Sequence, residues 1–206
     1  MRRTVKSLVL ALALLFLWRL RGGAQACSCF PRHPQEVFCQ TEVVIKATVV
    51  GKSEVSLKPG GGNPGIFDPS NFNVIKYDIQ QTGAFKGPEK LFGSVFTATN
   101  SAACGVNLVN GTEYLLPGRL DDNGLLHVSL CSFVSRWEDL SATQKRGVMQ
   151  RYQLGCDCKI TFCSSTPCGT TQSECLWTDF LMGQLFRHFT CIKRSDGCCG
   201  WFTGGL

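Results

Sequence analysis

Short runs of β-branched or alternating apolar residues recur along the chain after residue 41 and predict strands. The runs are bounded by Gly, Pro, Asn and Asp, which favour turns. They cover Glu42–Val50, Asn73–Gln80, Leu91–Thr99, Thr112–Leu116 and Leu125–Phe133. Five short strands without intervening helices predict a small antiparallel barrel, and hence a mainly β fold.

Two segments have the features of short helices that flank this barrel. Pro34–Thr41 is expected to begin one. Ser141–Tyr152 is expected to form the other and to close the barrel, with Ser141 as its cap and Val148 and Met149 on its apolar side.

The remaining segments have weaker patterns. Lys52–Asn71 holds three prolines and a run of three glycines, so we expect a long loop, and loops of this length are usually functional or disordered. Glu174–Leu185 fits the helical and the strand period equally, so its structure stays open. Gly200–Leu206 is expected to be a short tail.

Residues 1–26 have the three parts of a secretory signal. Basic residues come first, the apolar run Leu8–Leu17 follows, and Ala24-Gln25-Ala26 forms a small-X-small cleavage site. The apolar run is shorter than the roughly 20 residues that a membrane span needs. We therefore expect cleavage after Ala26, no membrane span, and a protein secreted to the extracellular space or matrix.

Removal of this leader changes the charge of the protein. Five of the 21 Lys and Arg residues lie in 1–26 and none of the 15 Asp and Glu residues does, so the net charge falls from +6 to +1. A nearly neutral chain gives no support for a nucleic-acid partner.

The 13 cysteines all follow the cleavage site, and such a density in an exported chain predicts disulfides. Structural zinc is the competing interpretation, through Cys156 with Cys158 and Cys163 with Cys168, but these spacings differ from the usual paired two-residue gap. Because the number is odd, one thiol is left over, and the adjacent Cys198 and Cys199 are the candidates.

The spacing of the cysteines divides the mature chain in two. Residues 27–156 hold six of them in 130 residues, whereas 157–206 hold seven in 50. The first part is long enough to bury an apolar core, and the second is small enough to depend on cross-links. We expect domains at 27–156 and 157–206.

Recognisable catalytic arrangements are missing from the sequence. His33, His127 and His188 lack the spacing of a zinc protease, and the chain has neither a nucleophile elbow nor a phosphate-binding glycine loop. A Cys-His protease needs a reduced nucleophile, which oxidising conditions disfavour. The sequence therefore indicates a binding protein with no catalytic residues and no cofactor of its own.

The amine of a mature Cys27 is a candidate metal ligand. A terminal amine has a pKa near 7.7–8.0, so deprotonation at pH 7 costs about 1 kcal/mol, against about 4.6 kcal/mol for lysine. Together with the carbonyl of the same residue it forms a five-membered chelate suited to the open position of a catalytic zinc. Such a ligand blocks an enzyme without offering it a bond to cut.

Neighbouring residues can support this role. If Cys27 and Cys29 are tied to distant cysteines, the segment 27–31 is held extended before binding, which lowers the ordering cost. Ser28 can then enter a specificity pocket; the alternative is a solvated surface serine. Asn110-Gly111-Thr112 is a glycosylation sequon, with Asn110 as the acceptor.

Several motifs resemble the tissue inhibitors of metalloproteinases, and the likeness runs from Cys27 to Trp201. It rests on Cys27-Ser28-Cys29, Pro31, His33-Pro34-Gln35, Cys39, Val44-Ile45-Lys46-Ala47, Cys104-Gly105, Leu130-Cys131-Ser132-Phe133, Trp137-Glu138-Asp139-Leu140-Ser141 and Cys175-Leu176-Trp177-Thr178-Asp179. The terminal Cys-X-Cys and the CLWTD string are highly specific.

The resemblance implies a netrin-like domain built on a five-stranded OB-type barrel with flanking short helices, followed by a small disulfide-rich module. It also implies a disulfide pairing that spacing alone cannot select. The implied pairs are Cys27–Cys104, Cys29–Cys131, Cys39–Cys156, Cys158–Cys199, Cys163–Cys168 and Cys175–Cys191. Cys198 is an extra cysteine, and a swap with Cys199 stays open.

The same resemblance implies how partners bind. The amine and carbonyl of Cys27 would take the zinc of a matrix metalloproteinase or a related zinc endopeptidase, and Ser28 would enter the primed-side pocket. The implied contact residues are Cys27, Ser28, Cys29, Phe30, Pro31, Gln40, Ser101, Ala102, Ala103 and Cys104. The loop at 52–71 would tune partner choice.

The second module is implied to have partners of its own. Some members use it to hold the hemopexin-like domain of a proenzyme, although this sequence ends at Leu206 without their longer acidic tail. Matrix components are a further implied partner.

Two other functions stay open at this point. A netrin-like signalling or matrix-binding protein would not need a free terminal cysteine, so a mature start at Ala24 would favour it. An enzyme has little support from the residues.

Overall fold

The computed structural model describes residues 27–57, 72–164, 167–179 and 183–203. The predicted signal at 1–26 lies outside the described residues, as do 58–71 of the predicted loop, 180–182 of the ambiguous segment and 204–206 of the predicted tail. Among the described residues, no helix is long and apolar enough to cross a membrane.

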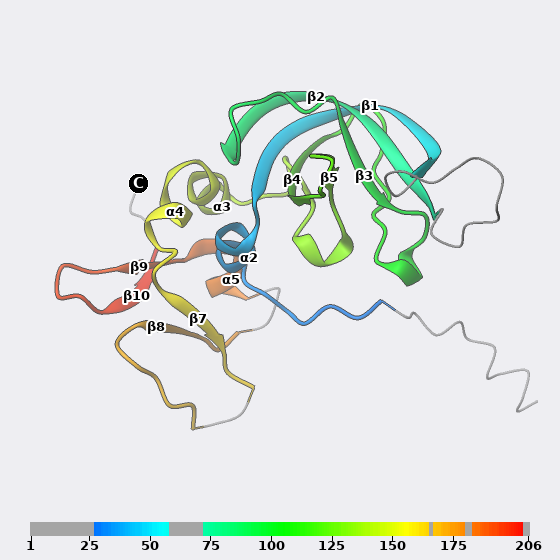
Figure 1. The fold of residues 1–206 in the computed structure, drawn as a ribbon. Coiled ribbons are helices and arrows are strands. Elements are labelled where there is room, and N and C mark those ends of the chain that lie inside the picture. The colour runs from blue at the N-terminus through cyan, green and yellow to red at the C-terminus, as the bar shows by residue number, and fades with distance from the viewer. Residues whose placement is uncertain (1–26, 58–71, 165–166, 180–182, 204–206) are drawn as a thin grey trace, which may run out of the picture.

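Six strands form the main sheet, and five of them close into a barrel (Figure 1). They are β1 (Val43–Leu57), β2 (Phe72–Lys86), β3 (Ser94–Ala98), β4 (Glu113–Leu120), β5 (Leu126–His127) and β6 (Ser135–Arg136). The order β1-β2-β3-β5-β4 closes because β4 also pairs with β1. The predicted mainly β fold with a five-stranded barrel is confirmed, but its antiparallel character is wrong for one pair, since β3 and β5 are parallel.

Strands β1 and β2 extend beyond the predicted limits. The predicted loop began at Lys52, but β1 continues to Leu57 and each residue from Lys52 to Leu57 pairs with β2, so 52–57 are strand. Most side chains of 51–57 are exposed or half-buried, so this part has little of the apolar burial that makes a strand visible in sequence. Backbone pairing, rather than core burial, stabilises the extension.

The predicted strand Leu125–Phe133 is mostly not a strand. Only Leu126 and His127 pair in the sheet, and a 3-10 turn, Leu130–Ser132, follows. The amide of Leu130 donates to the carbonyl of Cys104 (2.9 Å), so the chain leaves the sheet to join another loop.

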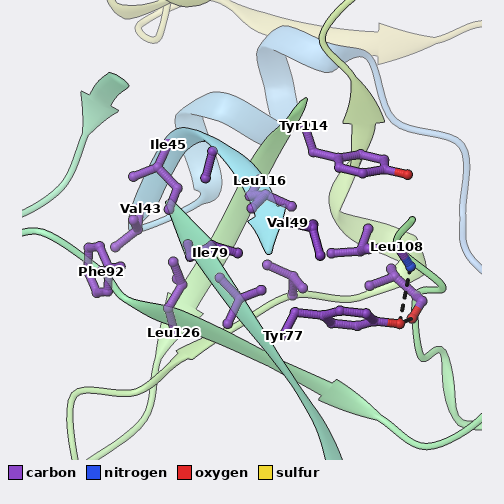
Figure 2. Close-up of a cluster of buried hydrophobic side chains, with 14 of the residues drawn as sticks. Val43, Ile45, Val49, Tyr77, Ile79, Phe92, Leu108, Tyr114, Leu116 and Leu126 are labelled. Carbon is purple, nitrogen blue, oxygen red and sulfur yellow. Dashed lines mark hydrogen bonds between the residues drawn. The ribbon is translucent and has the colours of Figure 1, made fainter. Parts of the chain in front are cut away.

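One face of β1 fills the barrel (Figure 2). Val43, Ile45 and Val49 alternate along the strand, because successive strand residues point to opposite faces, and each is at most 1% exposed. Tyr77 places its phenol inside this cluster, donating to the carbonyl of Val106 (3.2 Å) and accepting from the amide of Leu108 (3.1 Å). A buried hydroxyl is costly without such partners.

The opposite face of β1 packs on helices. Val44 and Leu115 contact Phe38, Val148 and Tyr152, which come from α2 (Pro34–Gln40) and from the helical segment after Ser141. The two predicted helices therefore flank the barrel, as expected.

The helical segment after Ser141 is less regular than predicted. It comprises α3 (Ala142–Arg146), a π-helical turn (Gly147–Arg151) and α4 (Tyr152–Leu154). Ser141 caps α3 as predicted, accepting from the amide of Gln144 (3.0 Å). The prediction that Val148 and Met149 form the apolar side of this helix is correct only for Val148, which is buried, because Met149 is 50% exposed.

Residues after Cys156 form two small ribbons and a helix. Strand β7 (Lys159–Phe162) pairs in parallel with β8 (Glu174–Trp177), and β9 (Thr190–Lys193) pairs with β10 (Cys199–Phe202). Helix α5 (Gln184–His188) precedes β9. The ambiguous segment thus begins as a strand and ends in a helix, and the predicted tail is wrong for 200–202, which belong to β10.

Six disulfides join the described cysteines. They are Cys27–Cys104, Cys29–Cys131, Cys39–Cys156, Cys158–Cys199, Cys163–Cys168 and Cys175–Cys191, the same pairs that the family resemblance implies. The sulfurs proposed as alternative zinc ligands are all in these bonds. Cys198 remains as the free cysteine of the described part of the chain, and it is half-buried.

Candidate functional site

The first described residues form an exposed ridge at one end of the barrel. The segment Cys27–Pro31 is extended and runs beneath the barrel loops toward α2 (Figure 1). The turn Ser101–Cys104 is joined to it by the Cys27–Cys104 disulfide, with the two Cα atoms 5.1 Å apart. We call these two segments together the N-terminal ridge. Ser28, Phe30 and Ser101–Ala103 are exposed on it.

Two disulfides form the base of the N-terminal ridge. Cys29–Cys131 lies beside Cys27–Cys104, with 3.8 Å between the sulfurs of Cys131 and Cys104. The four sulfur atoms all lie within 4.8 Å of one another, which is close enough to hold a metal ion. Because each sulfur is in a disulfide, none is a thiolate, and the cluster serves as a rigid cross-link instead.

Local hydrogen bonds shape the turn opposite Cys27. The side-chain oxygen of Asn100 accepts from the amide of Ala103 (3.0 Å), and the amide of Cys104 donates to the carbonyl of Ser101 (3.0 Å). Cys104 adopts a left-handed conformation with φ 61°, which is uncommon for a residue with a Cβ and needs the surrounding structure to hold it. Sequence reasoning missed Asn100, whose signal was its position just before the predicted Ser101–Ala103 contact.

Phe30 joins the N-terminal ridge to the second module. Its side chain is 72% exposed, yet its ring lies edge-to-face with Phe162 of β7 at a centroid distance of 6.3 Å. Such aromatic pairs contribute about 0.5–1.5 kcal/mol beyond their burial.

Gln40 does not lie on the N-terminal ridge but is connected to it through Arg32. The guanidinium of Arg32 donates from Nη1 to Oε1 of Gln40 (2.9 Å) and from Nη2 to the carbonyl of Cys131 (2.9 Å). The amide of Gln40 in turn donates to Glu36 (3.2 Å). Sequence reasoning missed Arg32, although it directly follows Pro31.

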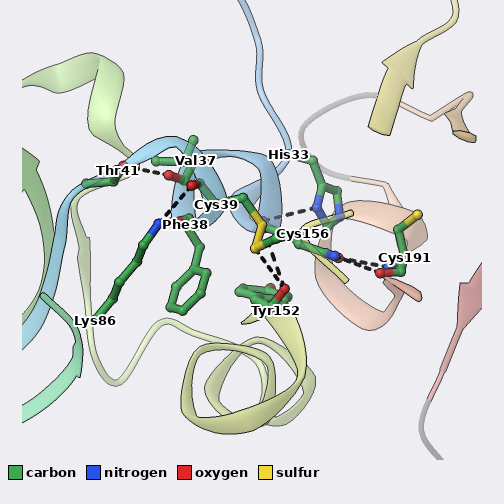
Figure 3. The surroundings of a disulfide bond; sticks show 10 residues. His33, Val37, Phe38, Cys39, Thr41, Lys86, Tyr152, Cys156 and Cys191 are labelled. Carbon is green, nitrogen blue, oxygen red and sulfur yellow. Dashed lines mark hydrogen bonds between the residues drawn. A yellow bond between two sulfur atoms is a disulfide. The ribbon is translucent and has the colours of Figure 1, made fainter. Parts of the chain in front are cut away.

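His33 anchors the end of the segment to both halves of the molecule (Figure 3). Its Nδ1 accepts from the amide of Gln35 (3.2 Å) and so caps α2, which leaves the proton on Nε2 to donate to the carbonyl of Leu185 (3.0 Å). The rings of Trp177 and Trp201 lie 5.9 and 5.2 Å from the imidazole. Burial in this aromatic environment lowers the pKa of His33 to about 4, so the side chain is neutral at pH 7.

Gln35 makes the second anchor. Its Nε2 donates to the carbonyl of Cys191 (2.7 Å) and its Oε1 accepts from the amide of Cys191 (2.8 Å). Because Cys191 is bonded to Cys175, the start of α2 is fixed to the core of the second module. The N-terminal ridge is therefore held by disulfides at one end and by α2 at the other.

The predicted glycosylation residue lies apart from the N-terminal ridge. Asn110 is exposed in the turn before β4. In the orientation that satisfies both atoms of its amide, the nitrogen donates to the carbonyls of Val49 (3.0 Å) and Val50 (3.2 Å). Glycosylation of Asn110 stays a prediction.

The sequence has clear relatives among known proteins. Residues 25–201 match the family described as "Tissue inhibitor of metalloproteinase". The chain is 45% identical to metalloproteinase inhibitor 2 of Cavia porcellus and 44% identical to that of Homo sapiens, each over 99% of this chain and 94% of the relative. It is 43% identical to the Gallus gallus protein of the same name, over 96% of this chain and 90% of the relative.

Proposed function

The chain belongs to the tissue inhibitor of metalloproteinase family, and we propose that it inhibits matrix metalloproteinases and related zinc endopeptidases through the N-terminal ridge. Family membership makes the protein an inhibitor rather than an enzyme. The observation that carries the mechanism is the extended segment 27–31, which is exposed at 28–30 and is fixed by the disulfides of Cys27 and Cys29.

The amine and carbonyl of Cys27 are the proposed ligands for the partner's metal. A catalytic zinc keeps one coordination position open for water or substrate, and the five-membered chelate of Cys27 would fill that position. The zinc belongs to the enzyme, so the inhibitor needs no cofactor of its own. The amine is available only after the bond between Ala26 and Cys27 has been cut.

Rigidity is what favours tight binding in this proposal. A flexible peptide in a protease cleft loses conformational entropy on binding, whereas a segment fixed by two disulfides has already lost it. Ser28 is exposed between the two cross-linked positions and is proposed to enter the primed-side pocket. Ala102 and Ala103, in the other segment of the N-terminal ridge, are small and exposed. An enzyme cleft could therefore cover the turn at 101–104 together with the segment 27–31.

The wider assignment follows from the same family membership. We propose 27–156 as the inhibitory domain and 157–206 as a C-terminal domain, secreted together after removal of 1–26. Binding of a proenzyme's hemopexin-like domain by the C-terminal domain, and binding of matrix components, are proposed only on the resemblance. The family supports metalloproteinases as the principal partners.

A chain extended by one residue at its amino terminus tests the chelation. Protein beginning at Cys27 is compared with protein that retains Ala26, using inhibition of a matrix metalloproteinase catalytic domain. We expect the extension to weaken inhibition by at least about 100-fold, because an amide nitrogen has no lone pair for the zinc and about 2.7 kcal/mol of binding corresponds to that factor.

The control is a chain with one residue added after Leu206, which should inhibit as the native chain does. Circular dichroism and melting temperature should be the same for all three proteins. Equal potency of the two amino termini would contradict the chelation mechanism.

A further inference from the structure

A hollow of about 330 Å³ lies next to the N-terminal ridge. Arg32 and Arg119 line it together with His127, Ser129, Cys131 and Ser132. Cys131 is bonded to Cys29, and Arg32 directly follows Pro31, so the hollow is continuous with the N-terminal ridge. We call it the Arg32–Arg119 pocket.

The close approach of β4 and β5 forms one wall of the pocket. Arg119 pairs with His127 across these strands. At the preceding position, Gly118, a Cβ would collide with the backbone oxygen of His127 and the side chain of Leu126, so only glycine allows the strands to come this near. Arg119 is exposed at the rim of the pocket.

The pocket carries a concentration of positive charge. Both guanidinium groups are permanently charged, and none of the described residues that line the hollow is Asp or Glu. The two acceptors of Arg32 are neutral oxygens, from Gln40 and Cys131, and they hold its plane in place. The carboxylate of Glu36 on α2 interacts electrostatically with Arg32 but is not among the residues that line the hollow.

Other polar groups of the wall can donate as well. The hydroxyls of Ser129 and Ser132 lie 3.1 Å apart, and one hydrogen of that pair remains for a ligand. The nearby carboxylate of Asp121 accepts from His127 (3.0 Å) and from the amide of Leu125 (2.8 Å), and although it keeps its negative charge it is not among the residues that line the hollow.

We propose that the Arg32–Arg119 pocket binds a carboxylate side chain, from an Asp or Glu at the rim of the metalloproteinase cleft. Two guanidinium groups and a serine hydroxyl match the planar, acceptor-only carboxylate. The inference rests on the proposed function, since the partner reaches the pocket only when its cleft covers the N-terminal ridge. The bound enzyme would also shield the guanidinium groups and the carboxylate from water, which strengthens the attraction between their charges.

The residue to change is Arg119, because Arg32 also supports the carbonyl of Cys131. Arg119→Gln removes one charge and keeps a polar side chain, and Arg119→Lys keeps the charge but loses the two-pronged geometry. Arg194→Gln is the matched control, since Arg194 is exposed in the β9–β10 turn of the other module and its loss changes the net charge equally.

Association rates and inhibition constants are measured against a matrix metalloproteinase catalytic domain in 50 mM and 300 mM NaCl. We expect Arg119→Gln to weaken binding about fivefold at low salt, less at high salt, and partly through slower association. Arg119→Lys should lie between this variant and the native chain, and Arg194→Gln should match the native chain.

A second measurement identifies the partner group. Rim Asp and Glu residues of the enzyme are changed one at a time to Asn and Gln and combined with Arg119→Gln. One enzyme variant should make the Arg119→Gln change silent, which shows direct coupling.

Two different failures can be told apart. If Arg119→Gln inhibits as Arg194→Gln does at both salt concentrations, while retention of Ala26 still weakens inhibition by at least about 100-fold, the pocket inference alone is wrong. If retention of Ala26 has no effect, the chelation mechanism is wrong whatever Arg119 does. Equal melting temperatures of the variants would exclude misfolding as the cause.

Discussion

His33 is a titratable residue that the fold keeps uncharged. Both ring nitrogens are engaged, the side chain has 0% exposure, and three aromatic rings of the second module surround it. Protonation would place a charge among apolar rings and break the bond that Nδ1 accepts from Gln35. The stability of the protein should therefore depend on pH in part through this residue.

The expected effect is a loss of stability in mild acid. The pKa of His33 is about 4 in the folded protein and about 6.5 in the unfolded chain, so between these values the unfolded state binds the extra proton. The contribution of His33 is thus complete above pH 6.5 and is lost as the pH falls toward 4. Between pH 7 and 4.5 the free energy of unfolding should fall by about 2–3 kcal/mol on its account.

Denaturant unfolding of the native chain and of His33→Gln at pH 7 and 4.5 measures how much His33 contributes to the change in the free energy of unfolding. The variant cannot titrate at position 33, so its stability should fall less over the same interval. Parallel pH profiles for the two proteins would show that His33 does not control the acid sensitivity.

The sequence singled out the terminal residues of the candidate site but not the residues that support them. Cys27, Ser28 and Cys29 stand out because they follow a cleavage motif. Arg32 and Asn100 act through a carbonyl at position 131 and an amide at 103, and such contacts depend on how distant loops meet. Their positions beside the predicted contact residues were the only signal in the sequence, and the contacts themselves are not visible in any local pattern.

At the scale of elements, a lysine at the end of β2 completes helix α2. The ammonium group of Lys86 donates to the carbonyls of Phe38 (2.9 Å) and Cys39 (2.8 Å), which lie in the last turn of the helix. These carbonyls have no partner within a helix of this length, so a cation there is favourable. Since α2 carries Cys39 and follows the N-terminal ridge, the contact also holds the ridge to the barrel.

Replacement of Lys86 by methionine should weaken the attachment of helix α2 to the barrel. The stem of the side chain is kept, but both hydrogen bonds are lost, so we expect the free energy of unfolding to fall by about 1–3 kcal/mol. Lys193→Met is the matched control, since Lys193 is exposed on β9 and its loss should change stability by less than about 0.5 kcal/mol. Equal stabilities of the two variants in urea would contradict a capping role for Lys86.

The elements that the sequence predicted correctly are those with buried, periodic side chains. The first half of β1 alternates Val43, Ile45 and Val49 inward and was found, whereas 52–57 are held by pairing with β2 and were assigned to a loop. The segment after Leu125 looked like a strand because it is apolar. Its course is set by the bond between Leu130 and Cys104 and by the disulfide of Cys131, which are tertiary features.

The two proposed domains meet through buried polar contacts. Gln35 pairs with the backbone of Cys191, His33 donates to Leu185, and the amide of Gln144 donates to the carbonyl of Phe186 (3.2 Å). Gly155 lies so close to the carbonyl of Cys191 that a Cβ would collide with it. The spacing of the cysteines is the basis of the proposed division of the chain, but it contained nothing about these contacts.

The fragment 27–156 should fold and inhibit without the second module. Both apolar clusters of the barrel and the three disulfides of Cys27, Cys29 and Cys39 lie within it. His33 and Gln35 would become exposed, so we expect a stability about 2–4 kcal/mol lower than that of the full chain, from lost hydrogen bonds and aromatic contacts.

The pKa of His33 reports directly on this junction. In the fragment it should rise from about 4 toward its ordinary value of about 6.5, because the burial that lowers it comes from Trp177, Phe186 and Trp201. An NMR titration of the imidazole in both proteins measures the change. A pKa that stays near 4 in a folded, inhibitory fragment would place the source of the burial within 27–156, and the acid sensitivity of the full chain would then not depend on contact between the modules.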